Sequence, residues 1–208
     1  GTGAAMVEHP GIRKISITGS TRTGQRVMAA AGATLKRLTL ELGGKNAQVI
    51  YPDADLDRAA QGILLGAFLN QGQVCTAGSR IYAHASVADA LKSKILALVP
   101  NLNIGDPFDP NTRMGSLSSR AHFERVSEYI AIGVREGGRI LCGGHPVQVD
   151  QYPKGLFMAP TLFEGVDPQA RIAREEIFGP VATFDSWDDE DAMFAQVNAV
   201  EQGLAAGV

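Results

Sequence analysis

The sequence predicts a protein of the α/β class, in which strands and helices alternate along the chain. Short aliphatic segments are followed repeatedly by longer segments whose apolar residues recur at helical spacing. The chain has 24 glycines among its 208 residues, which suits frequent turns between elements. With 45% hydrophobic residues, a chain of this length can also bury a core.

The first elements expected are a strand over 13–18 and, after a turn at 19–21, a helix over about 23–35. Extended segments follow at 38–42 and 47–51, and the turn residues Pro52 and Asp53 end the second. An amphipathic helix is expected from Asp55, where acidic residues cluster at its start, and its pattern breaks at 70–73.

The second half of the chain continues the alternation, with a loop at 103–113 that is rich in Gly, Pro, Asn and Asp. A surface loop is expected at 145–155, and Ser186 or Asp188 is expected to cap the last helix. Residues 203–208 resemble the start of another buried strand. The remaining expected elements are strands at 79–83, 139–142, 159–163 and 181–184, and helices at 87–98, 120–136 and 190–200.

Bulk properties exclude some functions. A net charge of −3 gives no support for nucleic-acid binding. No apolar run approaches the roughly 20 residues that span a bilayer, and no signal peptide is evident. With only two cysteines, Cys75 and Cys142, the chain needs no disulfide, so we expect a cytoplasmic protein. Both ends look cut, which predicts a fragment of a longer protein.

Two segments in the first quarter hold residue types that can carry chemistry. TGSTRTG at 18–24 is a glycine-rich turn whose backbone N–H groups suit a phosphate, although a plain turn is the alternative. LELGGKN at 40–46 places Glu41 before two glycines that permit close backbone packing. A surface salt bridge beside a turn is the alternative there.

Two further segments follow. NQGQVC at 70–75 is polar and lies beside a helix end, so Cys75 can be partly exposed and its thiolate stabilised by backbone dipoles, with a structural thiol as the alternative. Cys142 ends an apolar strand and is expected to be a buried core thiol. In REEIFGPV at 174–181 a carboxylate can hold ribose hydroxyls and Phe178 can stack on a flat ring. Two exposed acids before a strand are the alternative.

In order and spacing, these four segments resemble the signature set of the aldehyde dehydrogenase superfamily. The likeness is specific at GSTRTG, LELGGKN, NQGQVCTAGSR and EEIFGPV, and it continues through PDADLDRAA, GDPFDPNTRMG, APTLF and GLAA. It covers residues 12–208. The resemblance implies the end of a Rossmann-like NAD(P)-binding domain over 1–40 and a truncated catalytic domain over 41–208. The isolated piece is then expected to be inactive.

The resemblance also implies roles for individual residues. Cys75 would attack an aldehyde to form a thiohemiacetal, hydride would pass to NAD or NADP, and water would release the acid from the resulting thioester. Glu41 would be the general base, and the Cys75 backbone N–H would supply half of an oxyanion hole. The expected cofactor residues are Gly19, Ser20 and Gly24 at the phosphates, Leu42 and Gly43 near the nicotinamide, and Glu176 and Phe178 at the nicotinamide-side ribose and ring.

Some positions depart from the family pattern. Ala47 stands where the family often has Pro, His122 where it often has a cofactor-contacting Gln, and Arg125 replaces a nearby Lys. Lys45 is expected to be a structural ion-pair residue. No metal site is expected, and the whole protein would be a homo-dimer or homo-tetramer acting on a small aldehyde.

Three alternative functions remain at this point. In a CoA-acylating aldehyde dehydrogenase, CoA would take the thioester, although Glu41 favours water because hydrolysis needs a base. A cysteine hydrolase would need a histidine base near Cys75, and none of the four histidines has a recognisable catalytic context. A non-catalytic module is the third alternative.

Overall fold

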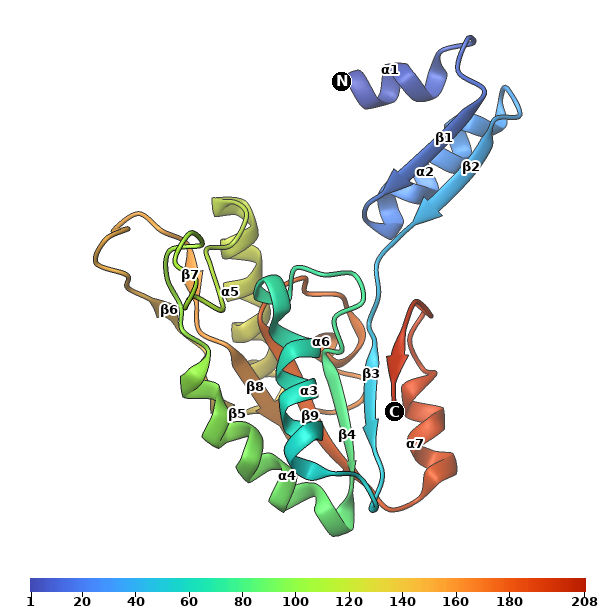
Figure 1. Ribbon diagram of the computed structural model, residues 1–208. Helices are drawn as coiled ribbons and strands as arrows, with labels where there is room; N and C mark the ends of the chain where they lie inside the picture. Colours follow the sequence, from blue (N-terminus) through green and yellow to red (C-terminus); the bar gives the residue numbers. More distant parts are fainter. The chain divides into compact units, whose positions relative to one another are not determined.

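The computed structural model describes all 208 residues, which form two compact units, Gly1–Gly43 and Gly44–Val208 (Figure 1). The mixed α/β class predicted from the sequence is confirmed in both. None of the helices combines the length and the apolar content that crossing a membrane requires.

In the first unit, two parallel strands and two helices surround a small core. The elements are α1 (Thr2–Glu8), β1 (Lys14–Thr18), α2 (Thr21–Gly32) and β2 (Arg37–Glu41). Strands β1 and β2 pair in parallel, and Thr18 lies opposite Glu41. Helix α2 begins two residues before the predicted start, because the Ser20 side chain accepts from the backbone N–H of Thr23 and caps it. Helix α1 was not predicted.

The second unit is built on a six-stranded sheet with the order β10-β3-β4-β9-β8-β5. All neighbouring pairs are parallel except β5, which runs antiparallel to β8. Two further short strands form a hairpin outside this sheet. The strands are β3 (Ala47–Ile50), β4 (Arg80–His84), β5 (Arg139–Cys142), β6 (Pro146–Val147), β7 (Phe157–Met158), β8 (Thr161–Glu164), β9 (Val181–Trp187) and β10 (Ala206–Gly207).

The helices of the second unit cover both faces of the sheet, because neighbouring strand residues point to opposite sides. In β4, Ile81 packs with the buried residues of α3 and α4, whereas Tyr82 packs with Met193 of α7. In β8, Phe163 packs with the buried side of α5. The helices are α3 (Leu56–Phe68), α4 (Ala85–Leu98), α5 (Arg120–Arg135), α6 (Arg171–Arg174) and α7 (Glu190–Val197), with short 3-10 turns at Leu69–Gly72 and Val99–Asn101.

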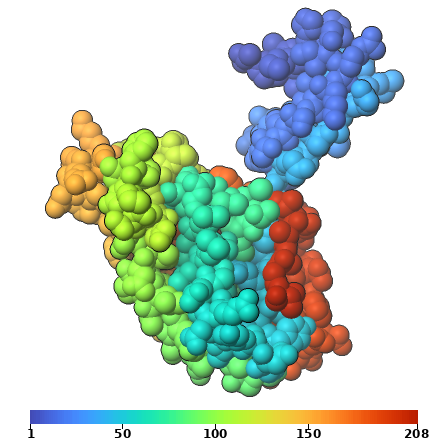
Figure 2. Space-filling model, viewed as in Figure 1, coloured from blue at the N-terminus to red at the C-terminus, as the bar shows by residue number.

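Several predicted boundaries were wrong. The cap of α7 is Asp189, whose carboxylate accepts from the N–H of Ala192, and neither Ser186 nor Asp188 has that role. The segment predicted as a surface loop at 145–155 contains β6, which pairs with β7. The predicted buried strand near the C-terminus is β10, and both its residues are exposed. The red end of the chain borders the cyan residues of β3 and α3 on the face in Figure 2.

Candidate active site

Cys75 lies in a tight turn that follows the end of α3. After that helix the backbone takes the left-handed conformation at three successive residues, Asn70, Gln71 and Gly72. The turn is then closed by a hydrogen bond of 3.0 Å from the N–H of Ala77 to the carbonyl of Val74. Cys75 is half-buried, which confirms the predicted partial exposure.

The Cys75 turn is packed against Gly44 and Asn46, the part of the LELGGKN segment that lies in the second unit. A methyl group added at Gly44 would lie 2.4 Å from the carbonyl oxygen of Cys75. The same oxygen accepts a 2.8 Å hydrogen bond from Nδ2 of Asn46. Glycine at position 44 therefore lets the backbones of two segments that are distant in sequence come into contact.

The EEIFGPV segment joins the same cluster. The N–H of Gly44 donates to Oε1 of Glu176 at 3.3 Å, while Oε2 of Glu176 has no protein partner. A methyl group at Gly72, whose φ is +67°, would lie 2.2 Å from the carbonyl oxygen of Gly179. Parts of three predicted segments that lie in the second unit, from residues 44–46, 70–75 and 174–181, thus come together, and residues from all three line a small cavity. It is lined by Gly44, Gly72, Val74, Ala77, Ser79, Glu176, Ile177, Phe178, Gly179 and Val181.

Two side chains of α5 hold the backbone around Phe178. Nε2 of His122 lies 2.6 Å from the carbonyl oxygen of Phe178, and the two rings meet edge to face. Arg125 donates to the carbonyl oxygen of Glu176 at 2.9 Å. Phe178 itself has φ of +61° and remains 40% exposed. Two of the three positions that depart from the family pattern, His122 and Arg125, therefore contact the loop that carries Glu176 and Phe178.

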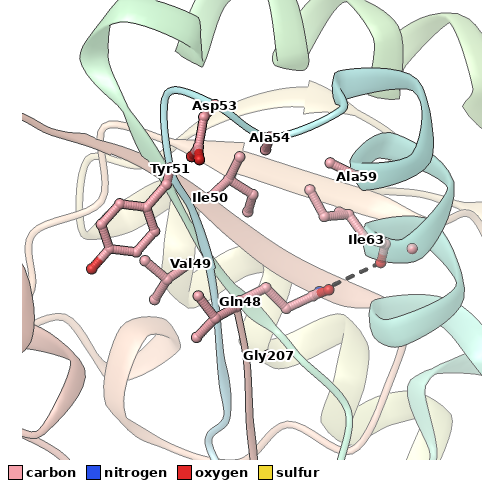
Figure 3. Close-up of a pocket in the computed structure, with 11 residues that line it drawn as sticks. Gln48, Val49, Ile50, Tyr51, Asp53, Ala54, Ala59, Ile63 and Gly207 are labelled. Atoms are coloured by element: carbon pink, nitrogen blue, oxygen red, sulfur yellow. Dashed lines mark hydrogen bonds between the residues drawn. The ribbon is translucent and has the colours of Figure 1, made fainter.

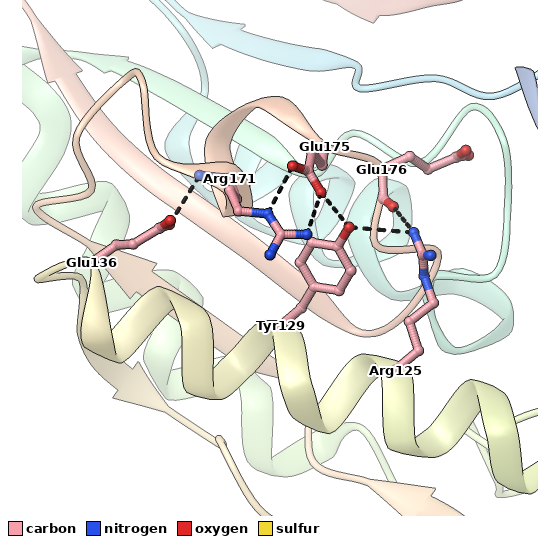
Figure 4. Close-up of polar contacts among 6 residues, drawn as sticks. All are labelled: Arg125, Tyr129, Glu136, Arg171, Glu175 and Glu176. Carbon is pink, nitrogen blue, oxygen red and sulfur yellow. Dashed lines mark hydrogen bonds and ion pairs between the residues drawn. The ribbon is translucent and has the colours of Figure 1, made fainter. Parts of the chain in front are cut away.

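The neighbouring carboxylate, Glu175, makes different contacts (Figure 4). Arg171 donates to both its oxygens at 2.8 and 2.9 Å, and the Tyr129 hydroxyl donates to Oε2 at 2.5 Å. The Arg171 guanidinium is the main reason that the pKa of Glu175 falls to about 2. Burial and the Glu175 contact raise the pKa of Tyr129. The two adjacent acids thus have different roles. Glu175 anchors α6 to α5, whereas Glu176 contacts Gly44.

In the first unit, the glycine-rich turn packs against the LELG segment. A methyl group at Gly24 would lie 2.7 Å from a side-chain carbon of Leu42, and the N–H of Gly19 donates to the carbonyl of Glu41 at 3.0 Å. Ser20 caps α2, as described above. Glu41 ends β2 and its side chain is exposed. Glu41, Leu42 and Gly43 belong to the first unit, whereas Cys75, Glu176 and Phe178 belong to the second.

Lys45 does not form the ion pair expected from the sequence. It is only 2% exposed and takes part in no salt bridge. Burial, followed by the nearby charge of Arg80, lowers the pKa of its ammonium to about 7. Buried Arg80 was missed by the sequence analysis. Its guanidinium donates to the carbonyl oxygens of Lys45, Gln196 and Val197 and so ties the segment before β3 to the end of α7.

Cys142 lies apart from this cluster at the end of β5. It is half-buried, its thiol contacts the carbonyl oxygen of Pro160 at 3.7 Å, and burial raises its pKa. Both cysteines are free.

The largest cavity described lies elsewhere, between β3, α3 and the C-terminal residues (Figure 3). Its volume is about 650 Å³, and none of the predicted site residues lines it. Gln48 spans part of it and donates to the carbonyl oxygens of Ile63 at 3.5 Å and Gly78 at 2.6 Å. Gln48 therefore supports the chain after Cys75, and none of the candidate reaction residues lines the cavity.

The clustered segments and the fold define a known class. The family model described as the aldehyde dehydrogenase family matches residues 1–208, and the chain belongs to this family. It is similar to a protein assigned as an aldehyde dehydrogenase from Burkholderia cenocepacia, with 43% identity, a TM-score of 0.95, and coverage of 98% of this chain and 42% of that one.

Two other solved structures are similar over the same span. The NAD-dependent aldehyde dehydrogenase of Sinorhizobium meliloti has 41% identity and a TM-score of 0.93, covering 98% of this chain and 40% of its own. The betaine aldehyde dehydrogenase of Staphylococcus aureus in complex with NAD⁺ has 35% identity and a TM-score of 0.94, again with 98% and 40% coverage. The chain therefore spans about two fifths of the length of these structures.

Proposed function

We propose that this chain carries the reaction centre of an NAD(P)-dependent aldehyde dehydrogenase that converts an aldehyde to a carboxylic acid, with Cys75 as its nucleophile. The observation that carries the proposal is the contact of the Cys75 turn with Gly44 and Asn46, beside Glu176. A half-exposed thiol in a tight turn suits covalent chemistry, and Gly44, which contacts the carbonyl oxygen of that turn, also binds a carboxylate that keeps one oxygen for a hydroxyl-bearing ligand.

The reaction proceeds at Cys75 in two covalent stages. The thiolate forms a bond to the carbonyl carbon of the aldehyde, and the backbone N–H of Cys75 stabilises the resulting oxyanion. When bound, NAD(P)⁺ supplies the two-electron oxidation by accepting hydride from that carbon. Glu41 takes a proton from the water that attacks the thioester carbon, the carbon–sulfur bond breaks, and the acid and the free thiol are released.

The residues present fit a dinucleotide. Glu176 Oε2 is free to accept from ribose hydroxyls, and the exposed ring of Phe178 offers a flat apolar face. In the first unit, Gly19, Ser20 and Gly24 form the start of a 12-residue helix that suits phosphate, and Leu42 and Gly43 adjoin it. We accordingly assign 1–40 to the cofactor domain and 41–208 to the catalytic domain.

The solved relatives support this assignment. One is described as NAD-dependent, and the Staphylococcus aureus enzyme is described in complex with NAD⁺. Structures of the latter record one cysteine both free of BME and modified by BME. A cysteine of that enzyme is therefore accessible to a small thiol reagent, as the proposal requires of Cys75. The substrate is proposed to be a small aldehyde, and the assembly a homo-dimer or homo-tetramer.

Separate replacement of each cysteine by serine tests the proposal. The assay uses the full-length enzyme, meaning a chain of the length of its solved relatives that contains residues 1–208. We expect Cys75→Ser to lose about 10³-fold or more in kcat, and Cys142→Ser, the matched control, to retain it. Aldehyde-dependent reduction of NAD and NADP is followed across a substrate panel. Wild-type turnover by Cys75→Ser would contradict the proposed nucleophile.

A second measurement separates water from CoA as the acceptor of the acyl group. We expect turnover without CoA and release of the free acid, because Glu41 can activate water. The Glu41→Gln variant should form the acyl-enzyme but release acid slowly. Strict dependence on CoA would overturn the hydrolytic assignment while leaving Cys75 as the nucleophile.

A further inference from the structure

Asn46 connects the Cys75 turn to two other segments through its buried side-chain amide. Asn46 is 4% exposed. Its Nδ2 donates to the carbonyl oxygens of Cys75 at 2.8 Å and Ala77 at 3.1 Å, and its Oδ1 accepts from the N–H of Ala205 at 2.9 Å. Both amide protons and the amide oxygen are therefore used, in a place where an unsatisfied group would be costly.

These bonds restrict the conformation of Cys75 itself. The hydrogen bond between Ala77 and Val74 closes the turn and orients the peptide that precedes Cys75. The bond from Asn46 orients the peptide that follows it. Together the two peptide planes determine the backbone angles of Cys75, and these angles determine the direction in which its Cβ leaves the chain and restrict the rotamers open to its Sγ.

The Cys75 carbonyl cannot move towards Gly44. Gly44 approaches the same oxygen so closely that even a methyl group would not fit between them. Ala77, two residues later, is held by the second donor of the same amide. The Asn46 amide consequently acts on both sides of Thr76, at the centre of the turn.

We propose that Asn46 is a positioning residue that orients Cys75 for attack, which rests on the proposed function of Cys75 as the nucleophile. The Asn46 amide is fully used by backbone groups, so it acts on the reaction through the Cys75 peptide. Its bond to Ala205 also links the turn to the residue before β10, so that the C-terminal strand supports the nucleophile.

The chain offers a matched control in Gln48. This residue lies two positions further along the same region, carries the same amide group, and donates to the carbonyl oxygen of Gly78 at 2.6 Å. It therefore holds the same loop but makes no contact with the Cys75 peptide. A general loss of loop stability should follow from either substitution, whereas loss of Cys75 orientation should follow only from Asn46.

The experiment compares Asn46→Ala, Asn46→Ser and Gln48→Ala in the full-length enzyme. The measurements are kcat, KM for the aldehyde, and the rate at which iodoacetamide alkylates Cys75 across pH, with the modified residue identified by mass spectrometry. We expect Asn46→Ala to lower kcat by about 10²-fold, as for a displaced reacting group, with little change in KM. The pH profile of Cys75 alkylation should shift as well.

The Ser variant provides the rescue. A serine hydroxyl can donate to one carbonyl, so Asn46→Ser should recover a substantial part of the kcat that Asn46→Ala loses. Gln48→Ala should lower the melting temperature while leaving the alkylation profile of Cys75 unchanged. If Asn46→Ala does not fold, Asn46→Ser is compared with Gln48→Ala instead. A kcat below that of wild type is then expected of Asn46→Ser and not of Gln48→Ala, even where the two variants have the same melting temperature.

Two results would overturn the proposal. One is an unchanged kcat and alkylation profile in the Asn46 variants. The other is an equal loss of kcat in Gln48→Ala without recovery by serine, which would make Asn46 merely structural. Failure of the underlying function is distinguishable, because Cys75→Ser, assayed in parallel, would then remain active whatever the Asn46 variants do.

Discussion

The backbone of Gly44 touches the carbonyl oxygen of Cys75, and no side chain could stand between them. Gly44 and the cysteine turn are therefore packed against each other, although β3 and α3 separate them in the sequence. This contact places a strict steric limit on position 44, and that limit can be measured.

Gly44→Ala should displace the Cys75 turn. The added methyl group must move a backbone carbonyl, and overpacking of this kind costs about 1–3 kcal/mol of stability. We expect a loss of about 10²-fold in kcat as well. Gly62→Ala is the control, because a methyl group there meets open space on α3 and should be neutral or stabilising. Equal activity of the two variants would show that Cys75 does not depend on this contact.

His122→Ala should weaken cofactor binding with a smaller effect on chemistry. The variant removes the side chain that contacts the carbonyl of Phe178, a residue held in a left-handed conformation. Loss of one hydrogen bond costs about 1 kcal/mol, so we expect KM for NAD(P) to rise about fivefold. His145→Ala, which removes a contact to the carbonyl of Gly143 instead, should leave KM unchanged. An unaltered cofactor KM in His122→Ala would contradict the assigned loop function.

Glu175 should make the chain sensitive to acid. Its pKa is lowered to about 2, chiefly by Arg171, so its contribution to stability is complete above the ordinary carboxyl pKa. That contribution is lost as the pH falls from about 4.5 towards 2, because the unfolded chain binds the proton first. Glu175→Gln should be less stable than wild type at pH 7 and equal to it near pH 2 in urea denaturation. A constant difference across this range would refute the assignment.

Lys45 should destabilise the fold at neutral pH and should do so less as the pH rises. Burial lowers its pKa to about 7, so between about 7 and its ordinary value the unfolded chain binds a proton that the folded chain does not. Stability therefore rises with pH in that window. Lys45→Met, which keeps the length of the side chain without the charge, should be more stable than wild type at pH 7, and this gain should shrink towards pH 10. A gain that does not change with pH would contradict the low pKa.

The sequence was sufficient for the α/β class and for most elements, because local periodicity and turn residues act over a few neighbouring positions. Prediction from the sequence was less successful for helix boundaries and residue burial, which depend on capping geometry and long-range contacts. Asp189 caps α7 because its carboxylate accepts from the N–H of Ala192. Several polar residues near this helix start can make such a bond, so the sequence alone does not identify the cap. Nothing in the local pattern around Arg80 indicates its burial, which depends on contacts with the distant end of α7.

The sequence by itself determined that Cys75 stands in a polar turn among four segments typical of aldehyde dehydrogenases, and the family match bears out that resemblance. Only the tertiary structure decided how the turn is held: by the missing side chain of Gly44, by the buried amide of Asn46, and by the close approach of Gly72 to Gly179. The physical reason is that motifs are encoded locally. Contacts between segments far apart in the chain depend instead on the pairing of β3 with β4 and on the side chains that the sheet buries.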